Sequence, residues 1–363
     1  MKKIEKIERY RDLAFQLLAI RAPKARYSFI RHGRYSNDFF SMPADQLRLF
    51  GFKNKDIYFV QNNYVQIAEE EIGRAKKNFI EIIFREDPEY PVRLKEIFDP
   101  PMLLYVLGDK SVLKKEKQLA VVGSRKGNNY GLTALKILLP SVVKEGIPVV
   151  SGMAYGIDAM AHNIALEEGG ETIGVNAGGL LHLYPAGNRQ LAKRIVSSGC
   201  IISEFPLDTI PRPFLFPIRN RIIAGLSGVI LLPQAEMRSG SLITARLGME
   251  QNREIIAVPG HITDPLSSGT NYLIQQGAKP ATSSSDILEE FGIEKKTEVS
   301  EMMNNLSSIE KKFLDLIEVN EVKGIDYFVE RAEYSISEVI TVLMGLVLKS
   351  VIVEEKGGFR RLV

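Results

Sequence analysis

Short apolar, β-branched runs recur through the middle of the chain and alternate with stretches of helical periodicity. They repeat at about 25–30 residues, the length of a βαβ unit, and read QLAVVG, IPVVSG, ETIGVNAGG, CIISEF, GVILLP and EIIAVPG. Strands that are apolar throughout and alternate with helices form a parallel sheet covered on both faces. The pattern therefore predicts an α/β protein with an extended Rossmann-like core. Ligands of such sheets bind beyond the carboxyl ends of the strands.

The segments on either side of this core follow other patterns. FIEIIF and MLLYVLG flank a proline-rich stretch and predict strands that lead into the sheet. The last part of the chain reads helix, helix, helix, hairpin, with a Gly357-Gly358 turn, which is the order of a winged helix. The predicted organisation is a helical accessory domain at 1–75, a Rossmann-like domain at 76–285, a linker at 286–306 and a winged-helix domain at 307–363.

Loops rich in glycine, serine and arginine follow five of the predicted strands. Backbone amides at a helix start, together with serine hydroxyls, bind anions, and an arginine offers a two-pronged donor for phosphate. Because the carboxyl ends of parallel strands meet at one edge of a sheet, we expect these loops to converge into one anion-binding site. The candidate residues are Gly123, Ser124, Arg125, Ser151, Gly152, Ala154, Gly156, Arg212, Phe214, Phe216, Arg219, Asn220, Arg221, Ser239, Gly240, Ser241 and Thr244.

One of these loops, FLFPIRNR at 214–221, sets aromatic residues beside two arginines. Aromatic rings stack on bases, at ~1–3 kcal/mol per base, while arginines hold the phosphates, and this combination is typical of proteins that bind single-stranded nucleic acid. The alternative is that the phenylalanines are core residues and the arginines pair with acids. Each glycine loop, taken alone, can also be a simple tight turn or helix cap.

Four residues near these loops have structural interpretations. Asp158 can cap the helix that follows SGMAYG through its first-turn amides. His162 lies four residues further on and shares a helical face with Asp158, so we expect a buried hydrogen-bonded pair, with an acid–base pair as the alternative. Pro259 and Gly260 predict a turn after EIIAV.

Charge and cysteine content narrow the function class. Residues 110–285 hold 18 Lys and Arg against 12 Asp and Glu, a balance of +6, while the remaining 29 and 32 give −3. A basic middle suits an anionic partner. A single cysteine, Cys200, excludes an intramolecular disulfide and favours a reducing cytoplasm. With four scattered histidines, we expect no metal and no cofactor. No apolar run approaches the ~20 residues that span a bilayer, so we expect no membrane partner.

Taken together, the loop motifs resemble the DprA/Smf family of DNA-processing proteins. The matching strings are VVGSRKGNNYG, VVSGMAYGIDAMAH, LYPAGN, FPIRNRIIAGLS, SGSLITA, AVPG and GTNYLIQQGA, in order over about 119–280. The sequence departs from the family pattern at Gln234, where an acidic residue is frequent, and at NAGGLLH. The resemblance implies that Arg125 and the loops at 151–156, 214–221 and 239–244 line a DNA pocket.

The resemblance also implies a function. A member of this family would bind and protect single-stranded DNA, load the RecA recombinase onto it during natural transformation, and form a homodimer. The competing interpretation is a nucleotide-binding protein or a nucleoside-monophosphate phosphoribohydrolase. Those hydrolases carry a PGGxGTxxE loop, but here the segment reads SGSLITARL, with Leu247 where the glutamate would be. The carboxylate for that chemistry is missing, so we expect a DNA-binding protein with no catalytic residue.

Overall fold

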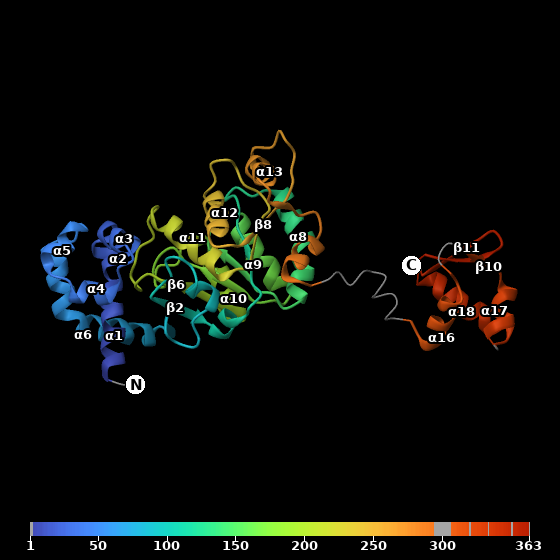
Figure 1. Cartoon of the computed structure of the whole chain (residues 1–363), viewed down its shortest axis with the longest axis horizontal. Helices are drawn as coiled ribbons and strands as arrows, with labels where there is room; N and C mark the ends of the chain where they lie inside the picture. The colour runs from blue at the N-terminus through green and yellow to red at the C-terminus, as the bar shows by residue number, and fades with distance from the viewer. Residues whose placement is uncertain (1–2, 294–305, 319–320, 333, 350, 363) are drawn as a thin grey trace. The chain divides into compact units, whose positions relative to one another are not determined.

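The computed structural model describes residues 3–293, 306–318, 321–332, 334–349 and 351–362. The chain divides into two compact units, at 1–293 and 294–363, and each has a hydrophobic core of its own. The predicted helical region and Rossmann-like region both lie in the first unit, and the predicted winged helix lies in the second (Figure 1).

A large mixed sheet runs through the first unit, in the strand order β1-β2-β6-β5-β4-β3-β7-β8-β9. From β6 to β9 in this order all neighbours are parallel, and β1 and β2 pair antiparallel at one edge. All eight apolar runs named above form strands. The bounds are β1 Ile80–Phe84, β2 Leu103–Gly108, β3 Leu119–Val121, β4 Val149–Gly152, β5 Thr172–Val175, β6 Gly199–Ser203, β7 Val229–Leu232, β8 Glu254–Ala257 and β9 Lys279–Pro280.

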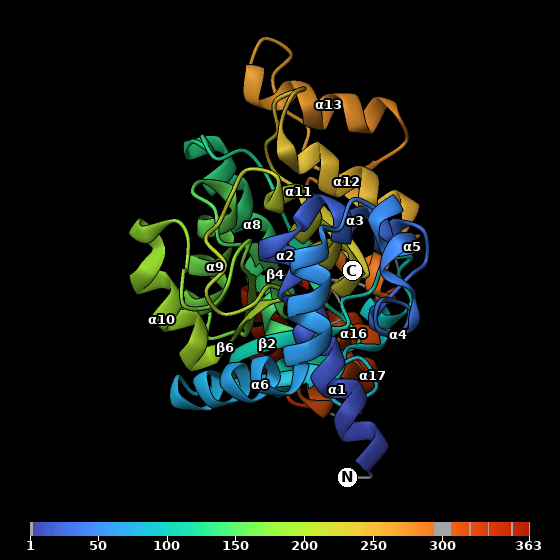
Figure 2. The same cartoon turned by 90° about the vertical axis from the view of Figure 1, so that its left-hand side faces the viewer.

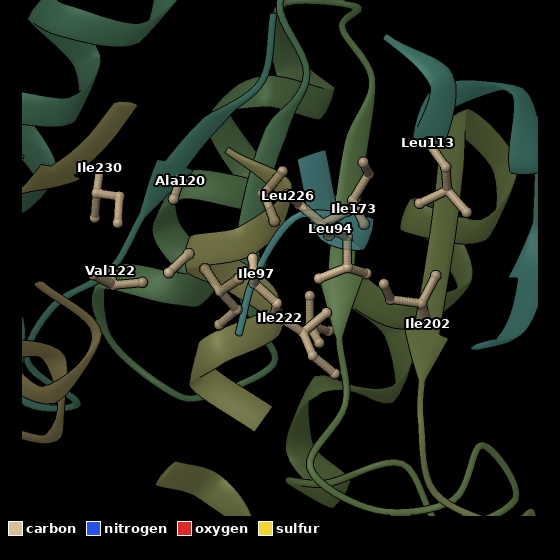
Figure 3. Packing of buried hydrophobic residues seen from close by; sticks show 14 of the residues in the cluster. Leu94, Ile97, Leu113, Ala120, Val122, Ile173, Ile202, Ile222, Leu226 and Ile230 are labelled. Atoms are coloured by element: carbon tan, nitrogen blue, oxygen red, sulfur yellow. The ribbon is translucent and has the colours of Figure 1, made fainter. Parts of the chain in front are cut away.

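Helices cover both faces of this sheet, as the apolar strands predict. In β3, Leu119 and Val121 face one core, whereas Ala120 faces the other. The first core contains α8 Asn129–Lys144, α9 Ile157–Glu167 and α14 Ser284–Leu288. The second core, drawn in Figure 3, contains α7 Val92–Lys95, α11 Leu215–Leu226, α12 Gly240–Glu250 and α13 Ser268–Gln275.

Residues 286–293 correct one predicted boundary. The sequence pattern places them in the linker, but Ile287 is fully buried against α8, and Phe291 and Ile293 pack on the same core. This segment therefore belongs to the first unit, because its apolar residues cover the last part of the core around the large sheet. Of the rest of the predicted linker, residues 294–305 lie outside the described residues, and Leu306 is buried in the core of the second unit.

Six helices form the N-terminal part of the first unit around an aromatic core. Phe15, Phe29 and Phe39 are fully buried and meet at centroid distances of 5.4–6.4 Å. Further along, Ala68 and Ala75 pack with strands β1 and β2, so this part is fixed to the sheet edge. The helices are α1 Lys3–Gln16, α2 Leu18–Arg21, α3 Pro23–Arg31, α4 Ser36–Ser41, α5 Ala44–Leu49 and α6 Asn54–Lys77.

The second unit combines helices with a small antiparallel sheet of order β10-β12-β11. Phe313, Phe328 and Phe359 are buried at its centre. The element order is that of a winged helix. The bounds are α16 Ser308–Asp315, β10 Val322–Lys323, α17 Ile325–Ala332, α18 Ile336–Leu348, β11 Ile352–Glu355 and β12 Gly358–Arg361. In the described parts of both units, no helix has the length and apolar character that crossing a membrane requires.

Candidate functional site

The strand order places a pocket at the point where the sheet changes its direction of winding. From β3 the chain proceeds through β4, β5 and β6 on one side, and it returns to the other side of β3 with β7. Such switch points open a crevice at the carboxyl ends of the strands. A pocket of about 260 Å³ lies there, formed by the loops after β3, β4 and β7 and by the first turns of α11 and α12.

Most of the residues predicted from the sequence meet in this pocket. Those that line it are Gly123, Ser124, Arg125, Ala154, Phe216, Arg219, Asn220, Ser239, Gly240, Ser241 and Thr244. The sequence patterns did not assign Lys126 or Glu236 to the site, and they gave Asp158 only a structural role, although all three line the pocket. Lys126 directly follows the Gly-Ser-Arg motif, so its place in the sequence could have identified it as a site residue.

Arg219 is the buried cation of the site. Its side chain enters the pocket from α11, its residue is only 4% exposed, and its Nε and Nη1 atoms have no hydrogen-bond partner among the described residues. Burial lowers the pKa of Arg219 to about 10, so the guanidinium stays charged at neutral pH. A buried charge whose donors are unsatisfied is costly unless a ligand completes it. The position is therefore suited to an anion.

Gly152 makes room for this guanidinium. A Cβ atom at position 152 would be 2.7 Å from Cζ of Arg219 and would also overlap the Asp158 carboxylate. Only glycine allows a side chain to lie this close to the end of β4. Gly156, the residue before α9, has a φ of +75°, and its backbone approaches the Ser124 carbonyl. Neither glycine lines the pocket, but together they set the positions of Arg219 and the β3 loop.

Asp158 supplies the negative charge next to Arg219. Burial raises the pKa of Asp158, while Arg219 and the backbone amides of Ala154 and Gly123 act in the opposite direction. The capping prediction for this residue is wrong, because the N-cap position of α9 is Gly156 and has no side-chain cap. Asp158 instead binds the loops that precede its own helix, and so it connects the β3 and β4 loops beneath the pocket.

His162 is held by other partners than the one predicted. Its Nε2 atom is 2.9 Å from the Gly152 carbonyl oxygen, and its Nδ1 atom is 2.6 Å from Oγ1 of Thr172. Burial lowers the pKa of His162 to about 4, so the ring is neutral. A carbonyl oxygen can only accept, and Nε2 therefore carries the proton. Both ring nitrogens are used by these two partners, and no hydrogen bond joins His162 to Asp158 in the described part of the chain; a structural role for His162 stays a prediction.

An aromatic ring and two arginines form one wall of the pocket. The guanidinium of Arg125 lies 4.9 Å from the centroid of Phe216, and that of Arg219 lies 5.9 Å from it. The half-exposed ring of Tyr184 packs edge-on against Phe216, 5.9 Å away. Arg125 itself is exposed to solvent. This arrangement presents a π-face between two positive charges, as a base with its flanking phosphates requires.

The start of α12 closes the opposite side. The Oγ atom of Ser239 accepts a hydrogen bond from the Ser241 amide at 3.2 Å and shares a second one with the Ser241 hydroxyl at 2.7 Å. Asn220 reaches across from α11 and donates to the Gly240 carbonyl at 3.4 Å. At the mouth, Lys126 lies 3.4 Å from Glu236. The pocket therefore offers hydroxyls and cations on most sides and one solvent-accessible carboxylate at its rim.

Two predicted residues are not site residues. Ser151 is fully buried, and its hydroxyl donates to the Val121 carbonyl at 2.6 Å, so it ties β4 to β3 beneath the pocket. Arg221 is held by Glu204 at 2.7 Å and by Asp99 at 3.1 Å. Although burial acts to lower it, these two carboxylates raise the pKa of Arg221 above the ordinary value. Its Nε and Nη2 atoms are used by these carboxylates, and although Nη1 has no partner among the described residues, Arg221 does not line the pocket.

Arg212 and Phe214 lie outside the pocket as well. Both line a different, larger groove that borders the N-terminal helices, while Pro217 lines both the groove and the pocket. The loop thus divides its side chains between two neighbouring depressions, which the sequence pattern did not reveal.

Hydrogen bonds hold the loop that contains Pro259 and Gly260. The Gly260 amide donates to Oδ1 of Asn271 at 3.1 Å and the Asn271 amide donates back to Gly260, while Tyr130 donates to the Pro259 carbonyl.

Gln234 replaces a frequent acid and is fully buried. Its side chain exchanges hydrogen bonds with Asn128 at the start of α8. The neutral amide of Gln234 both donates and accepts a hydrogen bond in this contact, so it holds the β3 loop without adding negative charge to the site.

Comparison with known proteins places the chain among DNA-processing proteins. Residues 81–292 match the family model of DNA recombination-mediator protein A. DNA processing protein DprA of Bacillus subtilis is 40% identical over 251 residues, covering 69% of this chain and 83% of that protein. Protein Smf of Escherichia coli is 39% identical over 283 residues, covering 75% of each.

Two solved structures are similar as well. The X-ray structure of DNA processing protein A from Streptococcus pneumoniae gives a TM-score of 0.64 at 34% identity, covering 78% of this chain and 96% of that one. A structure of DNA processing protein A from Helicobacter pylori, solved to describe its single-stranded DNA binding, gives 0.54 at 30% identity, covering 58% and 95%. The family model alone spans more than half of the chain, and the protein belongs to the DNA recombination-mediator protein A (DprA/Smf) family.

Proposed function

We propose that the chain binds single-stranded DNA in the pocket at the switch point of its sheet. The observation that carries this proposal is the buried guanidinium of Arg219, which has two unpartnered nitrogens and lies 5.9 Å from the Phe216 ring. A phosphate would satisfy those donors, and a base would stack on the ring or beside it. The homologue from Helicobacter pylori, which is described as a single-stranded DNA binder, supports the same ligand.

The pocket suits a single strand better than a duplex. A duplex keeps its bases stacked inside, so they cannot reach Phe216, and its phosphates follow a rigid path around a cylinder. A single strand can turn a base toward the ring while its phosphates reach the cations. Such binding is tolerant of sequence, because every base has a π-face, and it is sensitive to salt, because the phosphate contacts release counterions.

Three finer functions belong to this proposal. The chain protects single-stranded DNA and loads RecA recombinase onto it during natural transformation, it acts as a homodimer, and it works in the cytoplasm. The family description, recombination mediator, supports the first of these, and the free buried thiol of Cys200 suits a reducing compartment. RecA loading is tested by following RecA filament formation on DNA coated with single-strand-binding protein. Filament formation should be faster with this protein than without it.

The chain acts by binding and not by catalysis. At the position where related hydrolase loops carry a glutamate, Leu247 packs against the hydrophobic core below α12. The carboxylate that lies deepest in the pocket, Asp158, is occupied by loop amides and by the Arg219 charge. Release of ribose phosphate from AMP would restore the phosphoribohydrolase alternative, and we expect none.

The test of DNA binding is a titration of labelled oligo-dT at about 50 mM and 200 mM salt, with duplex DNA of equal length alongside. The logarithm of the binding constant should fall with the logarithm of salt concentration, with a slope of about −0.7 for each phosphate contacted by a single strand. Affinity that does not respond to salt, or equal affinity for the duplex, would contradict the proposal.

A further inference from the structure

A second groove adjoins the pocket, between the N-terminal helices and the loop that leads into α11. Its volume is about 930 Å³. Figure 2 shows the helical part of the unit in front of the sheet, with α2 and α3 near α11. Pro217 lines both depressions, so the pocket and the groove are neighbours at this residue.

The charge in this groove is strongly positive. The groove residues include five cations and one carboxylate, a balance of +4. The carboxylate, Asp56, is buried and is held by Arg21 at 3.1 Å. Within residues 3–293, none of the other cations forms an ion pair within 4 Å. Clefts lined by one sign of charge concentrate the opposite charge, so the four open cations favour a polyanion; they are Lys24, Lys53, Lys55 and Arg212.

Two aromatic rings lie among these cations. Tyr27, on α3, is 48% exposed, and Phe214, in the loop before α11, is 44% exposed. They come from opposite walls of the groove. Exposed rings between unpaired cations form the kind of surface on which successive bases stack while the phosphates are held. An acidic protein segment would form ion pairs with the cations, but its carboxylates would not stack on the two rings.

The two walls are fixed to each other by a buried polar network. Arg26 of α3 donates to the Gln16 side chain at 2.7 Å, and Gln16 donates to the backbone carbonyl of Glu204. The Glu204 carboxylate accepts from Arg221 of α11 at 2.7 Å. Glu204 thus connects α11 to the N-terminal helices, and the groove exists before any ligand arrives. A preformed surface costs less ordering on binding.

We propose that this groove is a second subsite for the same DNA strand, and that the N-terminal helices therefore take part in DNA binding. The inference rests on the proposed function, since it extends the strand from the pocket over Pro217 into the groove. It assigns a binding role to a part of the chain in which the sequence patterns showed no chemistry. Arg212 and Phe214 become DNA-binding residues of the groove, although they lie outside the pocket.

The test compares a short oligo-dT of about 4 nucleotides with a long one of about 16, the ends of the usual range for a single-strand site. The variant is Lys53→Glu combined with Lys55→Glu, at the start of α6. Its matched control is Lys76→Glu combined with Lys77→Glu, at the end of the same helix, where both lysines are exposed. Acidic residues are favourable at a helix start and unfavourable at its end, so unfolding would affect the control more.

We expect the groove variant to bind the long oligonucleotide about tenfold more weakly and to lower its salt slope by about 1.4, as two lost phosphate contacts require. Its affinity for the short oligonucleotide, and both affinities of the control, should stay as in the wild type. Tyr27→Ala is a second variant that leaves the charge intact, and it should also weaken binding of the long oligonucleotide alone.

The experiment distinguishes a failure of the groove inference from a failure of the proposed function. If the wild type binds neither oligonucleotide, the proposed function itself is wrong. If the wild type binds both, and both groove variants bind the long one as tightly as the wild type does, the pocket stands and the groove inference is overturned. Loss of binding to a poly-glutamate probe without any change for DNA would also overturn it, because the groove would then serve an acidic protein.

Discussion

The Arg219 guanidinium lies against the Cα atom of Gly152, so that a Cβ atom added at position 152 would be 2.7 Å from Cζ of Arg219. This packing brings a charge from α11 to the end of β4 and holds it beneath the pocket. Asp158, on the other side, approaches the same glycine. The position of the anion site therefore depends on a residue without a side chain that does not itself line the pocket.

Gly152→Ala should weaken oligo-dT binding by about tenfold or more, because the methyl group displaces the guanidinium from its place. Overpacking of a rigid site costs typically 1–3 kcal/mol, so the free energy of unfolding should also fall. Fluorescence anisotropy gives the affinity, and urea denaturation gives the stability. The control is Gly73→Ala in α6, where a Cβ atom would meet nothing within 4 Å. It should bind normally and gain up to about 1 kcal/mol. Normal DNA binding by the Gly152 variant would contradict the role given to Arg219.

Phe216 should contribute through its π-face and not only through its volume. Phe216→Leu keeps an apolar side chain between Arg125 and Arg219 but removes the ring, whereas Phe216→Tyr keeps the ring. We expect the leucine variant to lose about 1–3 kcal/mol of binding free energy with oligo-dT and the tyrosine variant to lose little. Equal affinities of the two variants, measured by isothermal titration calorimetry, would show that the ring does not stack on a base.

Arg125→Ala tests the exposed cation of the pocket. The side chain is solvent-accessible and forms no ion pair among the described residues, so its removal should leave the fold intact. We expect the slope of log K against log salt to become shallower by about 0.7, which is the loss of one phosphate contact on a single strand. Lys144→Ala, at the exposed end of α8, is the matched loss of one positive charge. An identical slope in wild type and Arg125→Ala would remove this residue from the site.

His162 should make the stability of the first unit depend on pH. Burial lowers the pKa of His162 from 6.5 to about 4, so between these values the unfolded chain takes up a proton and the folded chain does not. Its contribution is fully present above pH 6.5 and is lost as pH falls toward 4. Between pH 7 and pH 5 the wild type should therefore lose about 2 kcal/mol more than His162→Gln. Urea denaturation at both pH values measures this difference, and parallel losses in the two proteins would contradict it.

The sequence pattern predicted eight strands of the large sheet because each is an apolar run, and parallel topology followed from the helices between the runs; it did not predict β9, which is only the dipeptide Lys279–Pro280. It also predicted the convergence of the loops, since the carboxyl ends of parallel strands meet at one edge. Arg125, Phe216 and the Ser239–Thr244 segment lie together for that reason.

Side-chain partners were harder to predict, because they depend on contacts between distant segments. Arg219 and Arg221 are two residues apart on one helix and project in different directions, one toward the pocket and one toward Glu204. Asp158 and His162 have the spacing of a helical pair, but Asp158 accepts hydrogen bonds from loop amides and His162 contacts Thr172 instead. The groove beside the pocket could not be predicted either, because residues near positions 24, 54 and 213 meet only in the fold.

The most direct test of the account is a crystal structure of the protein bound to oligo-dT. We predict a phosphate oxygen within hydrogen-bonding distance of the unpartnered Nε or Nη1 of Arg219, and a thymine ring in contact with Phe216. A strand bound elsewhere on the molecule, with the Arg219 nitrogens still unpartnered, would contradict it.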